Sequence, residues 1–153
     1  MIQVDRRLVR APLETMFALA ADVERWPEHL PHYRRVRFLE RRTDGGLVEM
    51  AAWRPFGPFR YPTWWVSELT IDRQAPAVRH RHVRGITRGM DVLWAFAAGE
   101  AGLEVSITHW WDGPAWPLLR IPAASLVIGP LFVHHIAQRT LAGLAGAAER
   151  GRS

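Results

Sequence analysis

Six strand-like stretches follow one another through the middle of this chain, and this succession constrains its fold more than any other feature. Turns that contain glycine, proline or aspartate separate most neighbouring stretches. Strands joined by such short turns pair with their sequence neighbours in antiparallel fashion. The pattern therefore predicts one antiparallel meander. The stretches span residues 36–40, 47–53, 63–72, 78–84, 90–98 and 103–111.

Helical patterns lie only near the two ends of the chain. A first strand at 2–9 precedes a short amphipathic helix at 13–21, and we expect the side chain of Asp22 to cap a second short helix. Helical character is predicted again at 118–128 and at 130–149. The last helix needs a broad apolar partner, which only the concave side of a curved sheet provides. We therefore predict an α+β fold, with a curved antiparallel sheet of about seven strands wrapped around a long C-terminal helix.

Size and composition fit one domain. The 153 residues are 48% apolar, which suffices for a single core, and we expect one domain over 1–153. The longest apolar run, 126–133, is interrupted and much shorter than the ~20 residues that cross a bilayer. The chain has no cysteine, which excludes disulfides and thiolate chemistry, and no signal-peptide pattern opens it. A cytoplasmic protein is expected.

The net charge of +5 comes from arginine alone, since the chain has no lysine. The arginines lie beside acids, as in Glu24-Arg25 and Asp72-Arg73, and this is typical of a solvated surface of mixed sign. We therefore expect no nucleic-acid partner. A transient contact of 126–133 with a membrane or another protein stays open as a third class of function, and the sequence specifies no oligomeric state.

Alternation along the strands predicts which side chains face the concave side of the sheet. Successive residues point to opposite faces, and the less charged set belongs inside. On 78–84 the histidine face is expected inside, because neutral imidazoles cost less to bury than the arginines that the other face carries, Arg79 and Arg81. The inside set of this strand is Val78, His80, His82 and Arg84. In 47–53 the choice stays open between the side of Glu49 and the side of Met50. On the other strands the predicted inside residues are Trp65, Ser67, Leu69, Ile71, Val92, Trp94, Phe96, Ala98, Val105, Ile107, His109 and Trp111.

Tryptophans on the concave side suggest a cavity. Rigid indoles are hard to close-pack against a single helix, and their faces can hold a flat apolar ligand. The alternatives are ordinary core packing for each tryptophan and a hydrogen-bonded core position for each histidine. We treat His82 and His109 as candidates for hydrogen bonding or proton transfer to a hydrophobic small-molecule ligand. The candidate ligand-binding residues are Trp26, Trp65, Ser67, Leu69, His82, Trp94, Phe96, Ile107, His109, Trp111 and Phe132.

Other clusters of polar residues do not support catalysis or metal binding. His29 with His32, and likewise His134 with His135, lack a third ligand at a metal-binding spacing. Ser67 has no glycine elbow around it for Ser–His chemistry, and no glycine-rich loop precedes a helix to hold phosphate. We therefore expect no metal and no cofactor.

Several segments resemble one known family. The segment Phe17-Ala18-Leu19-Ala20-Ala21-Asp22-Val23-Glu24-Arg25-Trp26-Pro27, preceded by Val9-Arg10-Ala11-Pro12, is similar to the opening of START-like helix-grip proteins (SRPBCC) of the polyketide cyclase/dehydrase and coenzyme-Q-binding branch. The resemblance continues through Trp64-Trp65-Val66-Ser67, through Trp94, and through Gly129-Pro130-Leu131-Phe132 into Arg139-Thr140-Leu141. It covers nearly the whole chain and implies a cavity between the sheet and the final helix.

The resemblance implies two activities. Coenzyme-Q-binding relatives act as carriers or chaperones, which implies binding of a lipid, isoprenoid quinone or polyketide without catalysis. Aromatase/cyclases of the family cyclise and dehydrate a poly-β-ketone, and their pocket arginines align with Leu69 and His82 of this chain. Because neither position holds arginine, the carrier is our leading hypothesis and the cyclase is the alternative. The arginines that could substitute are Arg54, Arg79 and Arg84.

Overall fold

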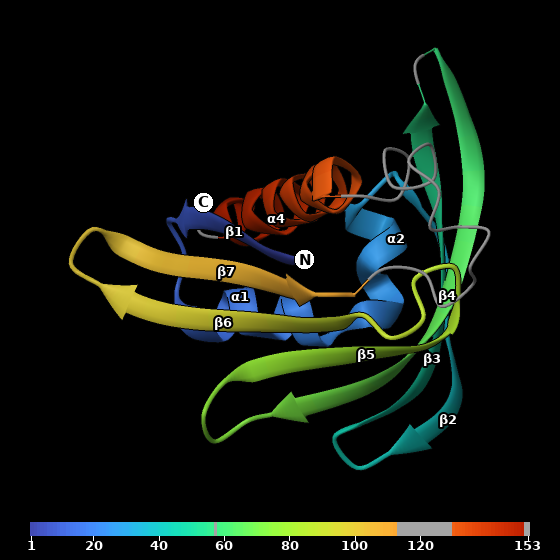
Figure 1. The fold of residues 1–153 in the computed structure, drawn as a ribbon. Coiled ribbons are helices and arrows are strands. Elements are labelled where there is room, and N and C mark those ends of the chain that lie inside the picture. The colour runs from blue at the N-terminus through green and yellow to red at the C-terminus, as the bar shows by residue number, and fades with distance from the viewer. Residues whose placement is uncertain (57, 113–129, 152–153) are drawn as a thin grey trace.

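The computed structural model describes residues 1–56, 58–112 and 130–151, which form a curved antiparallel sheet with helices on its concave side (Figure 1). The elements are β1 (Ile2–Val9), α1 (Leu13–Ala21), the 3-10 turn η1 (Val23–Arg25), α2 (Trp26–His29), β2 (Tyr33–Arg42), β3 (Gly45–Phe56), β4 (Phe59–Asp72), β5 (Ala77–Gly85), β6 (Asp91–Gly99), β7 (Gly102–Trp110) and α4 (Pro130–Arg150). The seven strands follow the order β1-β7-β6-β5-β4-β3-β2. The predicted α+β helix-grip fold is confirmed.

The segment between β1 and β2 forms the predicted short helices, but Asp22 acts differently. Its side chain makes no cap hydrogen bond. Instead its backbone carbonyl accepts from the Arg25 amide at 3.1 Å, because η1 is a single 3-10 turn closed by the backbone. The predicted capping role of the Asp22 side chain is therefore wrong. The helix predicted at 118–128 lies outside the described residues.

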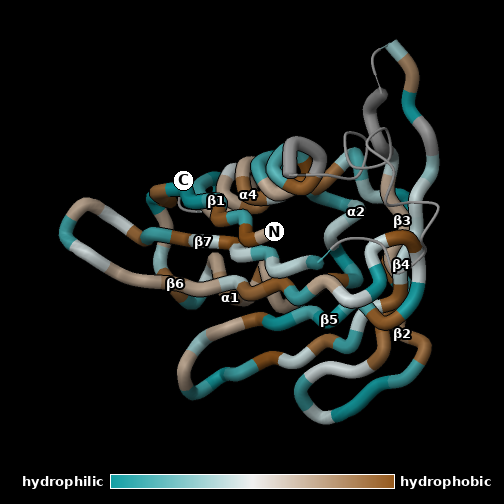
Figure 2. Tube along the Cα trace, in the orientation of Figure 1, coloured by the Kyte–Doolittle hydropathy of each residue, from teal (hydrophilic) through white to brown (hydrophobic). Residues whose placement is uncertain are grey.

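The strands bury their side chains largely as the alternation predicts. The predicted inside residues of β4 and of 103–111 are buried, as are Val78, His80 and His82 on β5. Arg84, predicted to lie inside with them, is exposed, because its guanidinium stays charged and solvated. Figure 2 shows polar and apolar residues alternating along the strands. Ala98 is exposed, contrary to the prediction, because the end of the β6–β7 hairpin extends past the helices (Figure 1). Phe96, nearer the core, is half-buried against the ring of Phe17, with centroids 5.5 Å apart.

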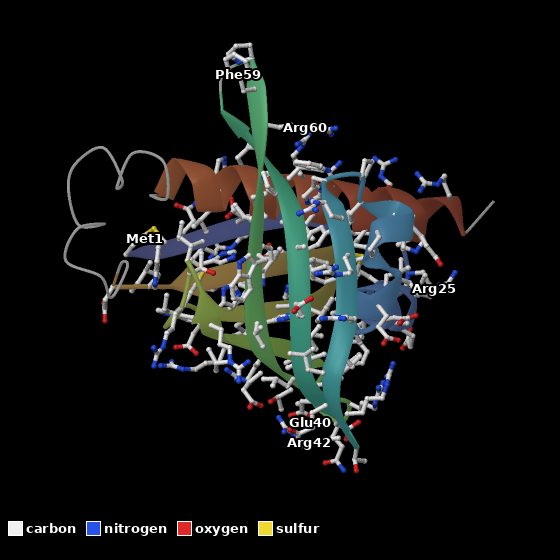
Figure 3. All side chains as sticks on the ribbon, turned by 90° about the vertical axis from the view of Figure 1, so that its right-hand side faces the viewer. Met1, Arg25, Glu40, Arg42, Phe59 and Arg60 are labelled. Carbon is white, nitrogen blue, oxygen red and sulfur yellow. The ribbon has the colours of Figure 1, made fainter. Side chains whose placement is uncertain are left out.

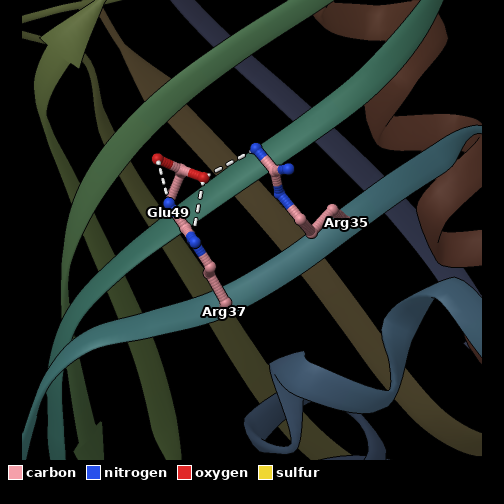
Figure 4. Close-up of polar contacts among 3 residues, drawn as sticks. All are labelled: Arg35, Arg37 and Glu49. Carbon is pink, nitrogen blue, oxygen red and sulfur yellow. Dashed lines mark hydrogen bonds and ion pairs between the residues drawn. The ribbon is translucent and has the colours of Figure 1, made fainter.

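Strand β3 turns Met50 inward and Glu49 outward, which decides the choice that the sequence left open. Met50 is 1% exposed. On the outer face, Arg35 Nη2 donates to Glu49 Oε1 at 2.8 Å, and Arg37 Nε donates to the same oxygen at 3.0 Å (Figure 4). The side chain of Glu49 is 17% exposed, whereas those of the arginines are 59% and 58% exposed. This shielded carboxylate ties β2 to β3.

Helix α4 lies across the concave side of the sheet and packs tightly against the end of α2 at a glycine. A Cβ atom added at Gly143 would meet Leu30 Cδ2 at 2.3 Å, so the two segments pack without room for a methyl group. Neither α4 nor any other helix in the described ranges is long and apolar enough to cross a membrane. The buried residues of α4 are Val133, Ala137, Thr140, Leu141, Leu144, Ala145 and Ala148.

The hairpin formed by β3 and β4 reaches beyond α4. Figure 3 shows Phe59 and Arg60 near its tip, with Glu40 and Arg42 at the opposite end of the sheet. Phe59 is 72% exposed, so its ring is not part of the core. The parts of β3 and β4 nearer their middle form the wall that faces α4.

Candidate functional site

A cavity of about 70 Å³ lies between the concave face of the sheet and α4. Strands β2 to β7, helix α2, the loop between β5 and β6, and α4 all contribute to its walls. The long-range topology therefore brings together residues that are distant in the sequence. Six of the candidate residues line this cavity, namely Trp26, Trp65, His82, Trp94, Ile107 and His109.

Four of the other candidates lie outside the cavity wall. Ser67 and Leu69 are buried on β4 but do not reach the cavity. Phe96 packs on Phe17, and the indole Nε1 of Trp111 donates to the carbonyl of Arg88 at 3.2 Å. The side chain of Phe132 is not among those that the structure describes. The ligand-binding role of every candidate residue stays a prediction.

Aromatic rings form a continuous wall along one side of the cavity. The Trp26 ring lies 5.8 Å from that of Trp94 and 5.3 Å from that of Tyr33, which it meets edge-on at 77°. Tyr33 in turn meets Trp65 at 6.1 Å, and Trp65 stacks on His82. The orientation of Trp26 is fixed because its Nε1 donates to the Leu19 carbonyl at 3.0 Å. A wall of this kind favours flat apolar ligands.

Three histidines share the polar side of the cavity. Burial, together with a smaller effect of the nearby His109, lowers the pKa of His80 to about 4. Burial also lowers the pKa of His109 to about 4, against an opposing influence of Asp5. The pKa of His82 is lowered chiefly by burial. All three imidazoles are therefore neutral at pH 7 and can each both donate and accept a hydrogen bond.

Several polar atoms of the wall have no hydrogen-bond partner among the described residues. These atoms are Trp65 Nε1, His80 Nε2 and His109 Nδ1. By contrast, His82 Nδ1 and Thr87 Oγ1 are joined by a hydrogen bond of 2.6 Å. A buried polar atom that stays unpaired costs about 1–3 kcal/mol, so such atoms at a cavity favour a ligand with polar groups.

A second set of hydrogen bonds joins Thr140 of α4 to Tyr33, the first residue of β2, and to His32, which precedes it. The Thr140 hydroxyl donates to the Ile136 carbonyl at 2.8 Å, so it accepts from His32 Nε2 at 3.1 Å. Burial lowers the pKa of His32 to about 4 and raises that of Tyr33, whose hydroxyl also bonds to Thr140. Tyr33 is consequently a neutral phenol at the cavity wall.

Some lining residues were missed by the sequence reasoning. Alternation placed His80 inside, but only His82 was selected from that strand. No pattern in the sequence indicated that Tyr33 and Thr140 line the cavity, because their positions there depend on how α4 crosses the sheet. The arginine side chains considered as substitutes, those of Arg79 and Arg84, are exposed, and the side chain of Arg54 is not among those described. No arginine lines the cavity within the described part of the chain.

Comparison with known proteins agrees with this architecture. Residues 9–128 match the family described as polyketide cyclase / dehydrase and lipid transport. A protein of Streptomyces halstedii is 32% identical over 98 residues, which are 63% of this chain and 87% of that protein. A protein of Streptomyces cyaneus is 28% identical over 67% of this chain and 64% of its own length. Both are named "Putative polyketide cyclase".

A solved structure is similar along the whole chain. The Zhui aromatase/cyclase from a Streptomyces species, strain R1128, superposes with a TM-score of 0.87 at 18% sequence identity, covering 100% of this chain and 96% of its own. At this identity the likeness shows the helix-grip fold, whereas the family match rests on the sequence. This chain belongs to the polyketide cyclase / dehydrase and lipid transport family.

Proposed function

We propose that this chain binds an aromatic, oxygen-bearing polyketide in the cavity beneath α4 and promotes its cyclisation or dehydration. One observation carries the proposal, namely the combination of an aromatic wall with unpaired nitrogens in the same cavity. Flat rings stack on Trp26 and Trp65, while keto and hydroxyl oxygens pair with Trp65 Nε1, His80 and His109. The names of the relatives support the same ligand class.

A ligand with oxygen atoms fits better than an isoprenoid or acyl chain. A hydrocarbon would leave Trp65 Nε1 and His80 Nε2 unpaired, at about 1–3 kcal/mol for each atom. A poly-β-ketone offers a carbonyl or enol on every second carbon and can satisfy both. This argument favours polyketides among the ligands expected for the family.

The cavity must widen to hold such a ligand. Its volume of about 70 Å³ is well below the ~300–1,000 Å³ of typical ligand pockets. Met50 and Met90 line it, and unbranched methionine side chains can change rotamer at little cost. We propose that these two side chains move apart when the ligand enters.

The chemistry that we propose is acid–base catalysis on a folded substrate. A neutral imidazole accepts a proton from a methylene group between two carbonyls, and the enolate oxygen is stabilised by the Trp65 N–H. The enolate carbon then attacks a second carbonyl, and the imidazolium gives the proton to the alkoxide that forms. In the dehydration, the neutral imidazole takes a second proton from the same carbon and gives it to the new hydroxyl group, which leaves as water. The confined cavity holds the chain in a reactive conformation.

The carrier function expected from the sequence is the second candidate. A histidine whose pKa is about 4 is a weak base, and both His80 and His109 have such values. With weak bases alone the protein would hold its ligand without transforming it. Binding and turnover therefore have to be measured separately.

Binding can be tested by tryptophan fluorescence with the trihydroxy-anthraquinone emodin, and with anthracene as the ligand without oxygens. We expect emodin to bind at least tenfold more tightly than anthracene. Trp65→Phe should weaken emodin binding, while the matched Trp64→Phe, at a residue 52% exposed, should not. Failure of emodin to bind would remove both candidate functions.

Turnover can be tested with an octaketide made in situ by a minimal polyketide synthase, with products separated by mass spectrometry. A cyclase changes the ratio of cyclised products when it is added. Binding without any change in that ratio would identify a carrier.

A further inference from the structure

A buried carboxylate lies on β1, behind the cavity wall. Asp5 is 1% exposed and is the single buried acid within the described ranges. Its Oδ1 accepts hydrogen bonds from Gln138 Nε2 at 3.0 Å and from His134 Nδ1, both on α4. The carboxylate is thus held from the side of the helix, and the side chain of His134 is 47% exposed. Asp5 has no part in the acid–base steps of the proposed function.

The other oxygen of Asp5 takes no part in these hydrogen bonds. Asp5 Oδ2 is buried and has no hydrogen-bond partner among the described residues, and the same holds for His109 Nδ1. In the register of β1 with β7, Asp5 lies opposite Ile107 and Gln3 lies opposite His109. Asp5 and His109 are therefore diagonal neighbours on the inner face of one antiparallel pair of strands. The Cα atoms of such neighbours are roughly 7–8 Å apart, a distance that long side chains can bridge.

The three cavity histidines differ in their charged neighbours. His109 is the one on which a carboxylate acts, because Asp5 raises its pKa against the larger effect of burial. The neighbouring His109 opposes protonation of His80, and both His80 and His109 oppose protonation of His82. A protonated histidine in the cavity is consequently stabilised best when it is His109, because Asp5 carries the compensating negative charge.

We propose that Asp5 is a positioning residue for His109, directing the Nδ1–H of its imidazole toward Asp5 Oδ2 and leaving Nε2 free to accept a proton in the cavity. This inference rests on the proposed function, because it names the histidine that performs the base step. The groups that face His109 are Asp5 from β1 and His80 and His82 from β5, while His134 of α4 reaches it only through Asp5.

The proton is accounted for at each stage. It leaves the substrate methylene carbon, whose electron pair forms the new carbon–carbon bond, and it moves to His109 Nε2. The resulting imidazolium carries protons on both nitrogens and is stabilised by the Asp5 carboxylate. The Nε2 proton then passes to the alkoxide oxygen that the attack creates, which returns His109 to its starting tautomer. In the dehydration, Nε2 takes the second proton of the same carbon, the carbon–oxygen bond breaks as the carbon–carbon double bond forms, and Nε2 gives that proton to the departing hydroxyl, which leaves as water.

The tautomer of His109 can be read at pH 7 from ¹⁵N shifts of the ring in the purified protein, without any substrate. We expect the Nδ1–H form in the wild-type protein. In Asp5→Asn the amide carbonyl can keep the bonds from α4 while its NH₂ group faces His109, so the tautomer should invert to Nε2–H. The matched control Glu104→Gln, on the outer face of β7, should leave the Nδ1–H form unchanged.

Activity supplies a second measurement. If the wild-type protein cyclises an octaketide, Asp5→Asn should lower kcat about a hundredfold with little change in KM, and Asp5→Glu should recover part of the loss. An Nε2–H tautomer in the wild-type protein, or an unchanged tautomer in a folded Asp5→Asn variant, overturns the inference. If Asp5→Asn does not fold, the wild-type tautomer alone decides. If no polyketide is turned over, the proposed function fails, but the tautomer still tests Asp5.

Discussion

The indole of Trp65 stacks on the imidazole of His82, with ring centroids 5.6 Å apart and an angle of 13° between their planes. The two residues lie on the adjacent strands β4 and β5, where the register shifts between Val66 and Ser67. The stack forms a flat surface that combines an apolar ring with a ring capable of hydrogen bonding. It is the place where the apolar and the polar parts of the cavity wall meet.

Replacing Trp65 by alanine should destabilise the protein by about 3–5 kcal/mol, because it removes a buried ring and leaves a void next to His82. Urea unfolding followed by circular dichroism measures this loss. The neighbouring Trp64→Ala, at an exposed position, should cost less than about 1 kcal/mol. Equal losses for the two variants would show that Trp65 is not packed as the structure indicates.

Gly143→Ala should destabilise the protein by roughly 1–3 kcal/mol, since the new methyl group would overlap with the fully buried Leu30 side chain. Gly146→Ala on the same helix is the matched control. Its nearest neighbour is the flexible end of Arg150, so better helix propensity should stabilise it by up to about 1 kcal/mol. Thermal unfolding of both variants tests whether α4 packs on Leu30.

Stability should fall as the pH drops below about 6.5. The pKa of His32, His80 and His109 is lowered to about 4 in the folded protein, while in the unfolded chain it is about 6.5. The unfolded state therefore binds more protons between these values, and the stability present at pH 7 is lost progressively toward pH 4. Urea midpoints at pH 7.5 and pH 5 should show the decrease.

The pH dependence has its own control. His80→Gln should make the decrease between pH 7.5 and pH 5 smaller, because one buried imidazole no longer resists protonation. His29→Gln, at a half-buried position outside the cavity, should keep the wild-type decrease. If the two variants behave alike, burial of His80 is not the cause.

Glu49→Gln should cost about 0.5–1.5 kcal/mol, because two arginine side chains lose a shared and largely shielded carboxylate. The loss should shrink when sodium chloride is raised to 1 M, where exposed charges are screened. Asp91→Asn, which removes a more exposed partner of Arg81, should cost less. A loss for Glu49→Gln that is independent of salt would contradict an electrostatic role.

The order of strands and helices could be predicted from the sequence, because period-two alternation and turn residues are local signals. The helix at Leu13–Ala21 and the strand at Ile2–Val9 have the predicted bounds. Alternation also indicated that His80 and His82 face inward, since burying arginine would cost more. The alternation failed at Ala98, because it predicts which face of the sheet a side chain lies on but not how far the core extends along that face.

The cavity could be predicted only in part. The side chains of Trp65, Trp94 and His109 reach it because they lie on the inward faces of strands that cross beneath α4. The contributions of Tyr33 and Thr140 depend on the position of α4, and the link from Asp5 to His134 joins residues 129 positions apart. Such contacts have no signature in a single sequence.

Strand β1 lies at one edge of the sheet and pairs only with β7 among the described residues. It therefore has no partner in the sheet until residues 102–110 have also been synthesised. Closing so long a loop is slow, and during that time an unpaired strand edge is exposed to other nascent chains. Synthesis that stops before β7 would therefore yield an aggregation-prone fragment instead of a smaller folded sheet.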